Sequence, residues 1–344
     1  MSILAQVSPD ILPDGRVTFR IIAPQAETVT VKGQWTKAPV TLTKKAKGLW
    51  EGTTPEAVPP GIHEYSFNVD KLRTIDFRNC MIKPQRWPKS SLLHIPESPP
   101  THWDIQAIPH GSIHHHDYYA DTLKAWRKLV VYTPPHYSNS GKPLPVLYLS
   151  HGFSDNQEAW TTSGKTHWIM NSLLNKEQAK PMIIVMPDAH PVDPEGRDDS
   201  YSERNTQAFA RELVADIIPF MESNYNVSKK PSGRAFAGLS MGGGHAFTVA
   251  FQHHDKFSYI GAFSAGAKDN AYIQQRAEVK SMNKDLQLFW IACGDKDFLF
   301  ERNETAHALM TKMGIEHEYV ITEGDNHSWP VWRRYLVEFL PLLF

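Results

Sequence analysis

The chain has 344 residues, and its 36 lysine and arginine residues balance 37 aspartate and glutamate residues to a formal net charge of -1. The chain has no excess of basic residues that would indicate a nucleic-acid partner. No apolar run approaches the roughly 20 residues that a membrane-spanning helix needs. The two cysteines, Cys80 and Cys293, fit neither a zinc-binding nor a redox spacing, and the segment "MSILAQVSPD" has none of the features of a signal peptide.

Residues 1–96 have the pattern of a small all-β domain. Short segments alternate between apolar and polar residues, and Gly-containing turns separate them: "RVTFRII", "TVTVKGQW" and "HEYSFNV", with turns at Asp14-Gly15, Lys47-Gly48 and Pro60-Gly61. We therefore predict an immunoglobulin-like β-sandwich here. The proline-rich stretch that follows, residues 97–110, is predicted to be a linker.

Residues 111–344 change to a pattern of buried strands and amphipathic helices. Seven apolar runs are typical of buried strands: "KLVVYTP", "PVLYLSHG", "MIIVMPD", "RAFAGLS", "YIGAFSA", "LFWIACG" and "EYVITEG". Helical spacing appears between them in "RELVADIIPFMESNY" and "MGGGHAFTVAFQHH". This alternation predicts an α/β domain with helices on both faces of a mostly parallel sheet.

The segment "RAFAGLSMGGGHAFTVAF" places a serine at a turn from a strand into a helix. Gly238 and Gly242 permit a sharp turn and close packing, so Ser240 is predicted to be an exposed nucleophile. The N–H of Met241 then lies at a helix N-terminus, where negative charge is stabilised. The alternative is a glycine-rich strand–helix junction without chemistry.

A serine nucleophile needs a base and an acid, which follow the serine in this kind of fold. His327 lies in a loop after "EYVITEG", and Asp295 and Asp297 lie in a loop after "LFWIACG". Either aspartate could orient the imidazole, and the local spacing does not decide between them.

Further residues near these loops are candidates for the rest of the site. In "LYLSHGFSD" the N–H of Phe153 is predicted to be a second oxyanion donor, and His151 is as well explained by packing. Four aromatic residues next to the catalytic loops could wall an acyl pocket or belong to the core: Trp160, Phe298, Trp329 and Trp332.

Two groups of residues raise the possibility of a metal site. Residues His114 to His116 are adjacent, and side chains alternate along a strand, so the three rings cannot share a face. Glu195, Asp198 and Asp199 fit a solvated loop better than a cation site. We therefore expect no metal and no cofactor.

Residues 108–344 resemble carbohydrate esterase family 1 of the α/β hydrolases, through "RKLVVYTPPHY", "VLYLSHGFSDNQEAW", "RAFAGLSMGGGHA", "ACGDKDFL" and "GDNHSWPVW". The family contains feruloyl esterases and acetylxylan esterases. The resemblance implies Ser240 as nucleophile, His327 as base and, through a Gly-x-x-Asp pattern, Asp297 as acid. It also implies the N–H groups of Phe153 and Met241 as oxyanion donors.

The first domain resembles early-set modules of carbohydrate-binding module family 48, through "TVTVKGQW", "GLWEGTTPEAVPPGIHEYSFNVD" and "IDFRN". The α-glucan-binding version has a lysine where Ser66 stands and an aromatic residue where "KLRT" has none, so starch or glycogen binding is not expected. Trp35 is either a sugar contact or a core residue.

Together these features predict a serine esterase that hydrolyses feruloyl esters on plant xylan or arabinoxylan and is secreted or periplasmic. Acetylxylan esterase and hydrolase of siderophores or other small esters are alternatives within the same mechanism. A glycan-binding protein on an inactive hydrolase scaffold is the non-enzymatic alternative. A peptidase of the prolyl oligopeptidase type is disfavoured, because no repeats of about 40–50 residues indicate a propeller.

Overall fold

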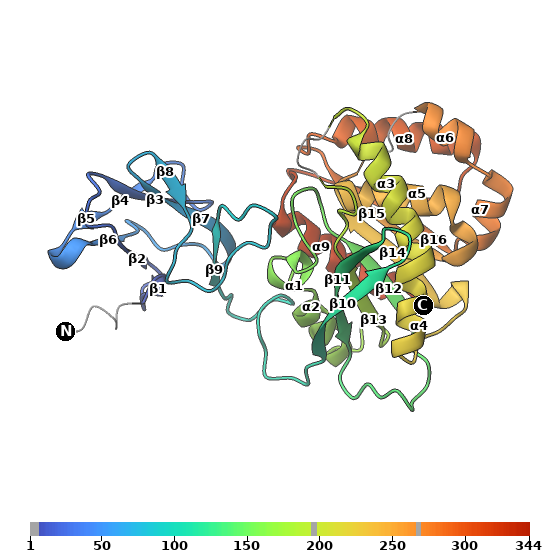
Figure 1. Cartoon of the computed structure of the whole chain (residues 1–344), viewed down its shortest axis with the longest axis horizontal. Helices are drawn as coiled ribbons and strands as arrows, with labels where there is room; N and C mark the ends of the chain where they lie inside the picture. The colour runs from blue at the N-terminus through green and yellow to red at the C-terminus, as the bar shows by residue number, and fades with distance from the viewer. Residues whose placement is uncertain (1–6, 194–197, 266–269) are drawn as a thin grey trace. The chain divides into compact units, whose positions relative to one another are not determined.

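The computed structural model describes residues 7–193, 198–265 and 270–344. The chain divides into two units, Met1–Asp104 and Ile105–Phe344, and each is described by itself (Figure 1).

The first unit consists of two antiparallel sheets. One has the order β1-β2-β6-β5 and the other the order β4-β3-β7-β8, with β9 also paired to β7. The strands are β1 Asp10–Ile11, β2 Val17–Ile22, β3 Val29–Gly33, β4 Val40–Thr41, β5 Thr43–Lys44, β6 Leu49–Thr53, β7 Gly61–Val69, β8 Leu72–Thr74 and β9 Ser91–Ile95. This arrangement agrees with the predicted all-β sandwich.

Trp35 is partly buried and packs against the core of this unit. Its ring stacks on Phe19 with the centroids 5.6 Å apart. The ring also covers Gly33, where a Cβ atom would lie 2.0 Å from the indole. Since its face is occupied by Phe19, the core alternative describes Trp35 better than the sugar contact.

The segment predicted as a linker, residues 97–110, is divided between the two units. Asp104 accepts hydrogen bonds from Thr101 and lies 2.7 Å from His94 Nε2, which ties it to the first unit. Beyond it, Asn171 Nδ2 lies 2.8 Å from His110 Nδ1, which ties the second half to helix α2 (Thr166–Asn175). The described chain therefore passes from one unit to the other at about residue 105.

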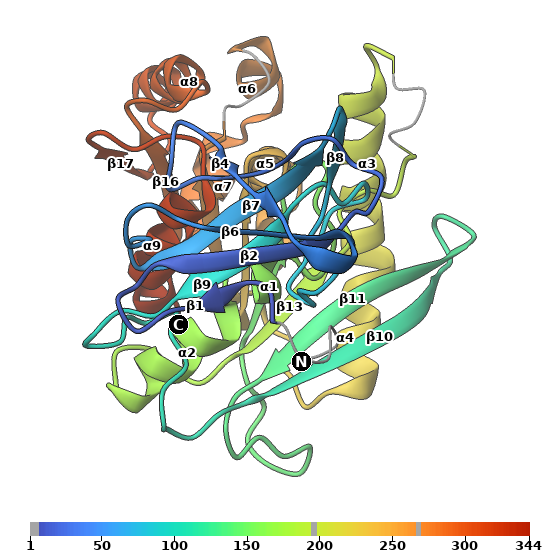
Figure 2. The same cartoon turned by 90° about the vertical axis from the view of Figure 1, so that its left-hand side faces the viewer.

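The second unit is built on an eight-stranded sheet of order β10-β11-β13-β12-β14-β15-β16-β17. The hairpin of β10 and β11 is antiparallel and forms one edge (Figure 2), β11 also pairs antiparallel with β13, and the strands from β13 to β17 are parallel. The strands are β10 Ser112–Ala120, β11 Ala125–Thr133, β12 Val146–Ser150, β13 Ile183–Pro187, β14 Arg234–Leu239, β15 Tyr259–Phe263, β16 Leu288–Gly294 and β17 Glu318–Thr322. All seven predicted strands are present.

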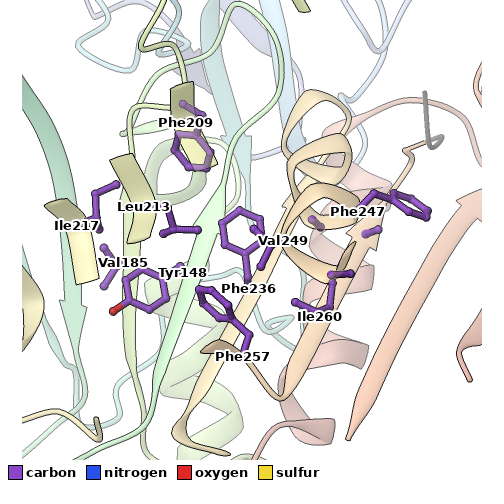
Figure 3. Close-up of a cluster of buried hydrophobic side chains, with 14 of the residues drawn as sticks. Tyr148, Val185, Phe209, Leu213, Ile217, Phe236, Phe247, Val249, Phe257 and Ile260 are labelled. Atoms are coloured by element: carbon purple, nitrogen blue, oxygen red, sulfur yellow. The ribbon is translucent and has the colours of Figure 1, made fainter. Parts of the chain in front are cut away.

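Helices cover both faces of this sheet, as the alternation of β15 shows. Ile260 belongs to a buried cluster with Phe209, Phe236 and Phe247 on one face (Figure 3). Phe263 packs against aromatic rings on the other face. The first face carries α3 Tyr201–Glu212, α4 Ile218–Asn224, α5 Met241–Gln252 and α8 Phe300–Met313, and the second carries α1 Ala159–Thr162, α2 and α9 Trp329–Phe339. Two more helices, α6 Asn270–Arg276 and α7 Val279–Asp285, precede β16.

The helix predicted from "RELVADIIPFMESNY" extends further than its apolar spacing indicated. It starts at Tyr201 as α3 and passes through a π-helical segment, Leu213–Ile217, into α4. The first turns of α3 are polar on most sides. Apolar periodicity therefore does not predict them from the sequence. No helix of the described residues is long and apolar enough to cross a membrane.

Candidate active site

Ser240 occupies a strained turn between β14 and α5. Its backbone angles are φ 52° and ψ -113°, a region that non-glycine residues rarely occupy and that often marks a functional site. A Cβ on Gly238 would lie 2.5 Å from the Gly242 carbonyl carbon, and one on Gly242 would lie 2.6 Å from the Ser150 carbonyl oxygen. Both positions therefore require glycine, and the tight packing holds the serine at the apex of the turn.

His327 and Asp297 complete a continuous line of hydrogen bonds to this serine. His327 Nε2 lies 3.0 Å from Ser240 Oγ, and His327 Nδ1 lies 2.8 Å from Asp297 Oδ2. Because a carboxylate only accepts, Nδ1 carries the proton and Nε2 is left as the acceptor facing the hydroxyl. This is the tautomer that can take a proton from the serine.

Asp297 is held as a carboxylate inside the protein. Its side chain is buried, and the Leu299 N–H donates to Oδ1 at 2.8 Å. Burial alone would raise the pKa of Asp297, but hydrogen bonds from His327, the Leu299 N–H and Ser264 outweigh it and hold the pKa below its ordinary value. The ionised form is thus the one that faces the imidazole.

Asp295 is directed elsewhere. Its Oδ1 accepts the Gly324 N–H at 2.7 Å and its Oδ2 pairs with Lys296 at 3.1 Å. It joins the loops that follow β16 and β17 without contacting His327. Of the two aspartates that local spacing left open, Asp297 is the one beside the imidazole.

The aromatic residues predicted to line an acyl pocket have a different place. Trp160, Trp329 and Trp332 are buried, with exposed fractions of 1%, 6% and 6%. Trp160 Nε1 donates to the Ser150 carbonyl and Trp332 Nε1 to Ser264 Oγ, both at 3.0 Å. They form a packed layer in which the Trp332 ring lies 4.9 Å from that of His327. The burial and packing of these three rings favour the core alternative, and their role at an acyl pocket stays a prediction.

Phe298 is the exception among these four aromatic residues. It is 74% exposed, and its ring centroid lies 4.4 Å from that of His327. It covers the base from the solvent side and does not line the cavity described below.

The loop after β12 lies directly beside the serine. A Cβ on Gly152 would lie 3.5 Å from Ser240 Cβ. The next residue, Phe153, therefore lies close to the nucleophile and lines the same cavity. The Met241 N–H is the first of helix α5 and has no intrahelical acceptor. The roles of both N–H groups as oxyanion donors remain a prediction.

Two histidines hold the shape of this loop. His151 is buried, donates from Nδ1 to the Gly152 carbonyl at 2.8 Å and accepts the Ala189 N–H at Nε2. His190 accepts the Ser154 N–H at 3.2 Å, and its Nδ1 lies 2.7 Å from the Tyr201 hydroxyl. His151 is thus a packing histidine, as its alternative predicted. Sequence reasoning missed His190, which lies in an irregular segment without a motif.

A cavity of about 380 Å³ lies next to Ser240. It is bounded by one face of α5 and by residues of α3, α6 and α8. Its described lining includes Phe153, Tyr201, Asn205, Gln207, Ser240, Met241, Gly244, Phe247, Thr248, Tyr272, Leu299 and Arg302. None of the four predicted pocket aromatics is among them. In the sequence, the wall that α3 contributes to this cavity corresponds to the polar stretch "YSERNTQ" at the start of the helix.

In the two groups considered as metal sites, the three histidines and Asp198 have other partners. His116 Nε2 lies 2.5 Å from the Tyr225 hydroxyl and His114 Nε2 lies 3.1 Å from Thr133 Oγ1, while His115 points to the opposite face near Glu158. Asp198 accepts hydrogen bonds from Ser200 before α3, and Glu195 lies outside the described residues. In residues 7–193, 198–265 and 270–344 no three histidine, cysteine, aspartate or glutamate side chains are grouped to hold a metal ion.

Comparison with protein families identifies the second unit. The Esterase family model matches residues 120–343, which is more than half of the chain. The chain belongs to the Esterase family. A second model, carbohydrate-binding module 48 (isoamylase N-terminal domain), matches residues 5–78 of the esterase.

Individual relatives extend this picture. The esterase is 29% identical over 351 residues to an endo-1,4-beta-xylanase/feruloyl esterase of Xylanibacter ruminicola, covering 98% of this chain and 46% of the relative. The chain thus spans less than half the length of that relative.

Two solved structures share the fold. A CE1 ferulic acid esterase from Anaeromyces mucronatus, in complex with ferulic acid, has a TM-score of 0.63 at 23% identity, over 70% of this chain and 93% of that one. The enterobactin esterase of Shigella flexneri has a TM-score of 0.67 at 17% identity, over 95% of this chain and 92% of that one. The predicted fold, an α/β hydrolase preceded by an all-β unit, and the resemblance to carbohydrate esterase family 1 are confirmed.

Proposed function

We propose that the esterase hydrolyses feruloyl and related hydroxycinnamoyl esters on plant xylan or arabinoxylan through an acyl-enzyme. The observation that carries this proposal is the hydrogen-bonded line Asp297–His327–Ser240, whose serine lines a cavity of about 380 Å³. The relative from Xylanibacter ruminicola, named a xylanase/feruloyl esterase, supports the choice of acyl group and polymer.

In the first half of the reaction, Ser240 Oγ attacks the ester carbonyl carbon while His327 Nε2 takes its proton. Asp297 stabilises the imidazolium that forms. The negative charge on the carbonyl oxygen is held by the N–H groups of Met241 and Phe153. When the tetrahedral intermediate collapses, the bond to the sugar oxygen breaks, and that oxygen takes the proton from His327.

In the second half, water replaces the sugar. His327 takes a proton from the water as its oxygen attacks the acyl carbon, and the same N–H groups hold the second oxyanion. Collapse of this intermediate breaks the bond to Ser240 Oγ, which recovers its proton from His327. The carboxylic acid leaves, and the reaction needs no cofactor.

The size of the cavity favours an aromatic acyl group over acetate. Ligand pockets typically measure about 300–1,000 Å³, and the cavity beside Ser240 falls within this range at about 380 Å³. An acetyl group would leave most of it empty, whereas a hydroxycinnamoyl group would extend into it along α5.

The partner of the esterase is accordingly an acylated cell-wall polysaccharide or oligosaccharide. The match of residues 5–78 to carbohydrate-binding module 48 supports a polymeric rather than a small substrate. Because such polymers lie outside the cell that degrades them, we place the esterase in a secreted or periplasmic location.

The test is to measure release of ferulate and acetate from feruloylated, acetylated arabinoxylan by the wild type and by Ser240→Ala. We expect ferulate release by the wild type, and a decrease of about 10⁴-fold or more in the variant. Acetate release alone would move the enzyme to the acetylxylan branch. Release of neither acid would refute the polysaccharide assignment and point to small esters such as siderophores.

A further inference from the structure

A buried ion pair joins strand β11 to the end of helix α3. Arg127 donates from Nε to Glu212 Oε1 at 2.9 Å, and the Tyr118 hydroxyl donates to the same oxygen at 2.6 Å. The Glu212 side chain is fully buried, and the Arg127 side chain is 10% exposed. A buried ion pair adds little to stability on its own, because both charges must be removed from water. This pair therefore indicates a further role for the arginine.

The same guanidinium fixes the chain segment that follows β13. Arg127 Nη2 donates to the Asp188 carbonyl at 2.6 Å, and Nη1 donates to the His190 carbonyl at 3.1 Å and to Asp188 Oδ2 at 3.3 Å. Together with the two bonds to Glu212, these contacts engage all five N–H donors of the guanidinium. A lysine has no such planar set of donors, so the arginine is suited to hold this backbone at two points.

The segment Asp188–His190 holds the peptide group that carries the predicted oxyanion donor. The Ala189 N–H donates to His151 Nε2 at 2.9 Å, and His151 Nδ1 donates to the Gly152 carbonyl at 2.8 Å. This carbonyl and the Phe153 N–H belong to one trans peptide group, in which the two point in opposite directions. Rotation of the group would turn the N–H away, and His151 opposes that rotation because it holds the carbonyl.

A second contact holds the loop on the other side of Phe153. The Ser154 N–H donates to His190 Nε2 at 3.2 Å, and the Phe153 ring packs edge-on against this imidazole with the centroids 5.4 Å apart. Ser154 has a φ of 68°, a left-handed conformation that a non-glycine residue keeps only where its surroundings enforce it. Since Arg127 holds the His190 carbonyl, it fixes the backbone from which the imidazole extends.

We propose that Arg127 is a positioning residue for the oxyanion donor. It fixes the segment Asp188–His190, and through His151 and His190 this segment keeps the Phe153 N–H directed toward the oxygen that becomes negative. The inference rests on the proposed function and deepens it, because it gives this N–H a support outside the site. Arg127 is not among the described residues that line the cavity beside the nucleophile, so its role is orientation alone.

The experiment measures kcat and KM of the full-length protein for methyl ferulate and for 4-nitrophenyl acetate. Removal of one oxyanion donor lowers kcat by about 10²–10³-fold. We expect Arg127→Met, which loosens the donor without removing it, to lower kcat by about 10–100-fold for both esters and to leave each KM within about threefold. A trifluoromethyl ketone analogue of methyl ferulate forms an oxyanion when Ser240 attacks it, so its affinity should fall by about the same factor as kcat/KM.

A double variant separates this role from stability. Arg127→Met leaves Glu212 as a buried charge without its partner, which is strongly destabilising. Arg127→Met combined with Glu212→Gln removes both charges, and the new amide can still accept from Tyr118. In thermal unfolding the double variant should be more stable than Arg127→Met. It should keep the loss of kcat, because the carbonyls of Asp188 and His190 still lack their donor.

Arg234→Met is the matched control. Arg234 is also buried, pairs with Glu222 and donates to the Lys229 carbonyl, but it begins β14 at the opposite end of the strand from Ser240. This variant should lose thermal stability and keep kcat within about twofold of the wild type.

Wild-type kcat in folded Arg127→Met or in the double variant, or a loss confined to KM, would overturn this inference and leave the proposed function intact. A wild type that hydrolyses 4-nitrophenyl acetate but not methyl ferulate would refute the feruloyl assignment, and the kcat of the variants for 4-nitrophenyl acetate would then decide the role of Arg127. A wild type that hydrolyses neither ester would refute both.

Discussion

Replacement of Asp297 by asparagine tests the proposed triad at its most buried member. The Leu299 N–H donates to Asp297 Oδ1 at 2.8 Å, so the asparagine oxygen stays at that position and its NH₂ group takes the place of Oδ2. That group faces His327 Nδ1 and cannot accept its proton. The imidazole then shifts its proton to Nε2, where it can no longer accept from Ser240 Oγ.

We expect Asp297→Asn to lower kcat by about 10⁴-fold, which corresponds to about 5 kcal/mol of transition-state stabilisation. The assay is steady-state hydrolysis of methyl ferulate, with KM measured separately because the cavity is left intact. Thermal unfolding of the variant controls for folding.

Asp295→Asn is the matched control for this prediction. The asparagine oxygen can still accept the Gly324 N–H, and the lost pair with Lys296 is partly exposed, so kcat should change by no more than about twofold. An Asp297→Asn enzyme within about tenfold of the wild type, or a larger loss in Asp295→Asn, would show that the structure misassigns the orienting carboxylate.

Two further predictions concern stability. Gly238→Ala should lower the free energy of unfolding by about 2–3 kcal/mol, because its Cβ would lie 2.5 Å from the Gly242 backbone. Gly244→Ala should raise the free energy of unfolding by up to about 1 kcal/mol, because no described atom lies within 4 Å of its Cβ. Equal effects of the two variants in urea unfolding would contradict the argument that the turn at Ser240 requires glycine. Burial lowers the pKa of His245 to about 3, while the unfolded chain has a value of about 6.5. Protonation of the unfolded state should therefore reduce stability as the pH falls from about 6.5 toward 3, and His245→Phe, which keeps the stack on Phe209, should lose less stability over this range than the wild type does.

The residues of the candidate triad could be predicted because their constraints are local. The turn at Ser240 needs small residues on both sides whatever the rest of the chain does, so Gly238 and Gly242 are visible in the sequence. The acid and base follow buried strands whose apolar runs are equally visible. The choice between Asp295 and Asp297 was not local, since it depends on which side chain the loop turns toward His327, and only the family resemblance indicated it.

The walls of the cavity beside Ser240 could not be predicted in the same way. Nearness in the chain to a catalytic loop suggested Trp160, Trp329 and Trp332, but burial of a ring depends on the helix packed against it. The polar residues of α3 that line the cavity are far from any motif, and α3 comes close to the nucleophile because it packs on α5. A single sequence contains no direct signal for that contact.

The two faces of the sheet contribute different parts of this site. The aromatic layer of Trp160, Trp329 and Trp332 lies on the face of α9 and supports the loop of His327. The cavity lies on the face of α3 and α5, and the turn at Ser240 is shared by both. Since the two sets of side chains have no residue in common, a change among the cavity residues of α3 should alter the choice of ester without disturbing the hydrogen bond from Ser240 to His327. Substitutions in the tryptophan layer should do the reverse and lower kcat for every ester alike.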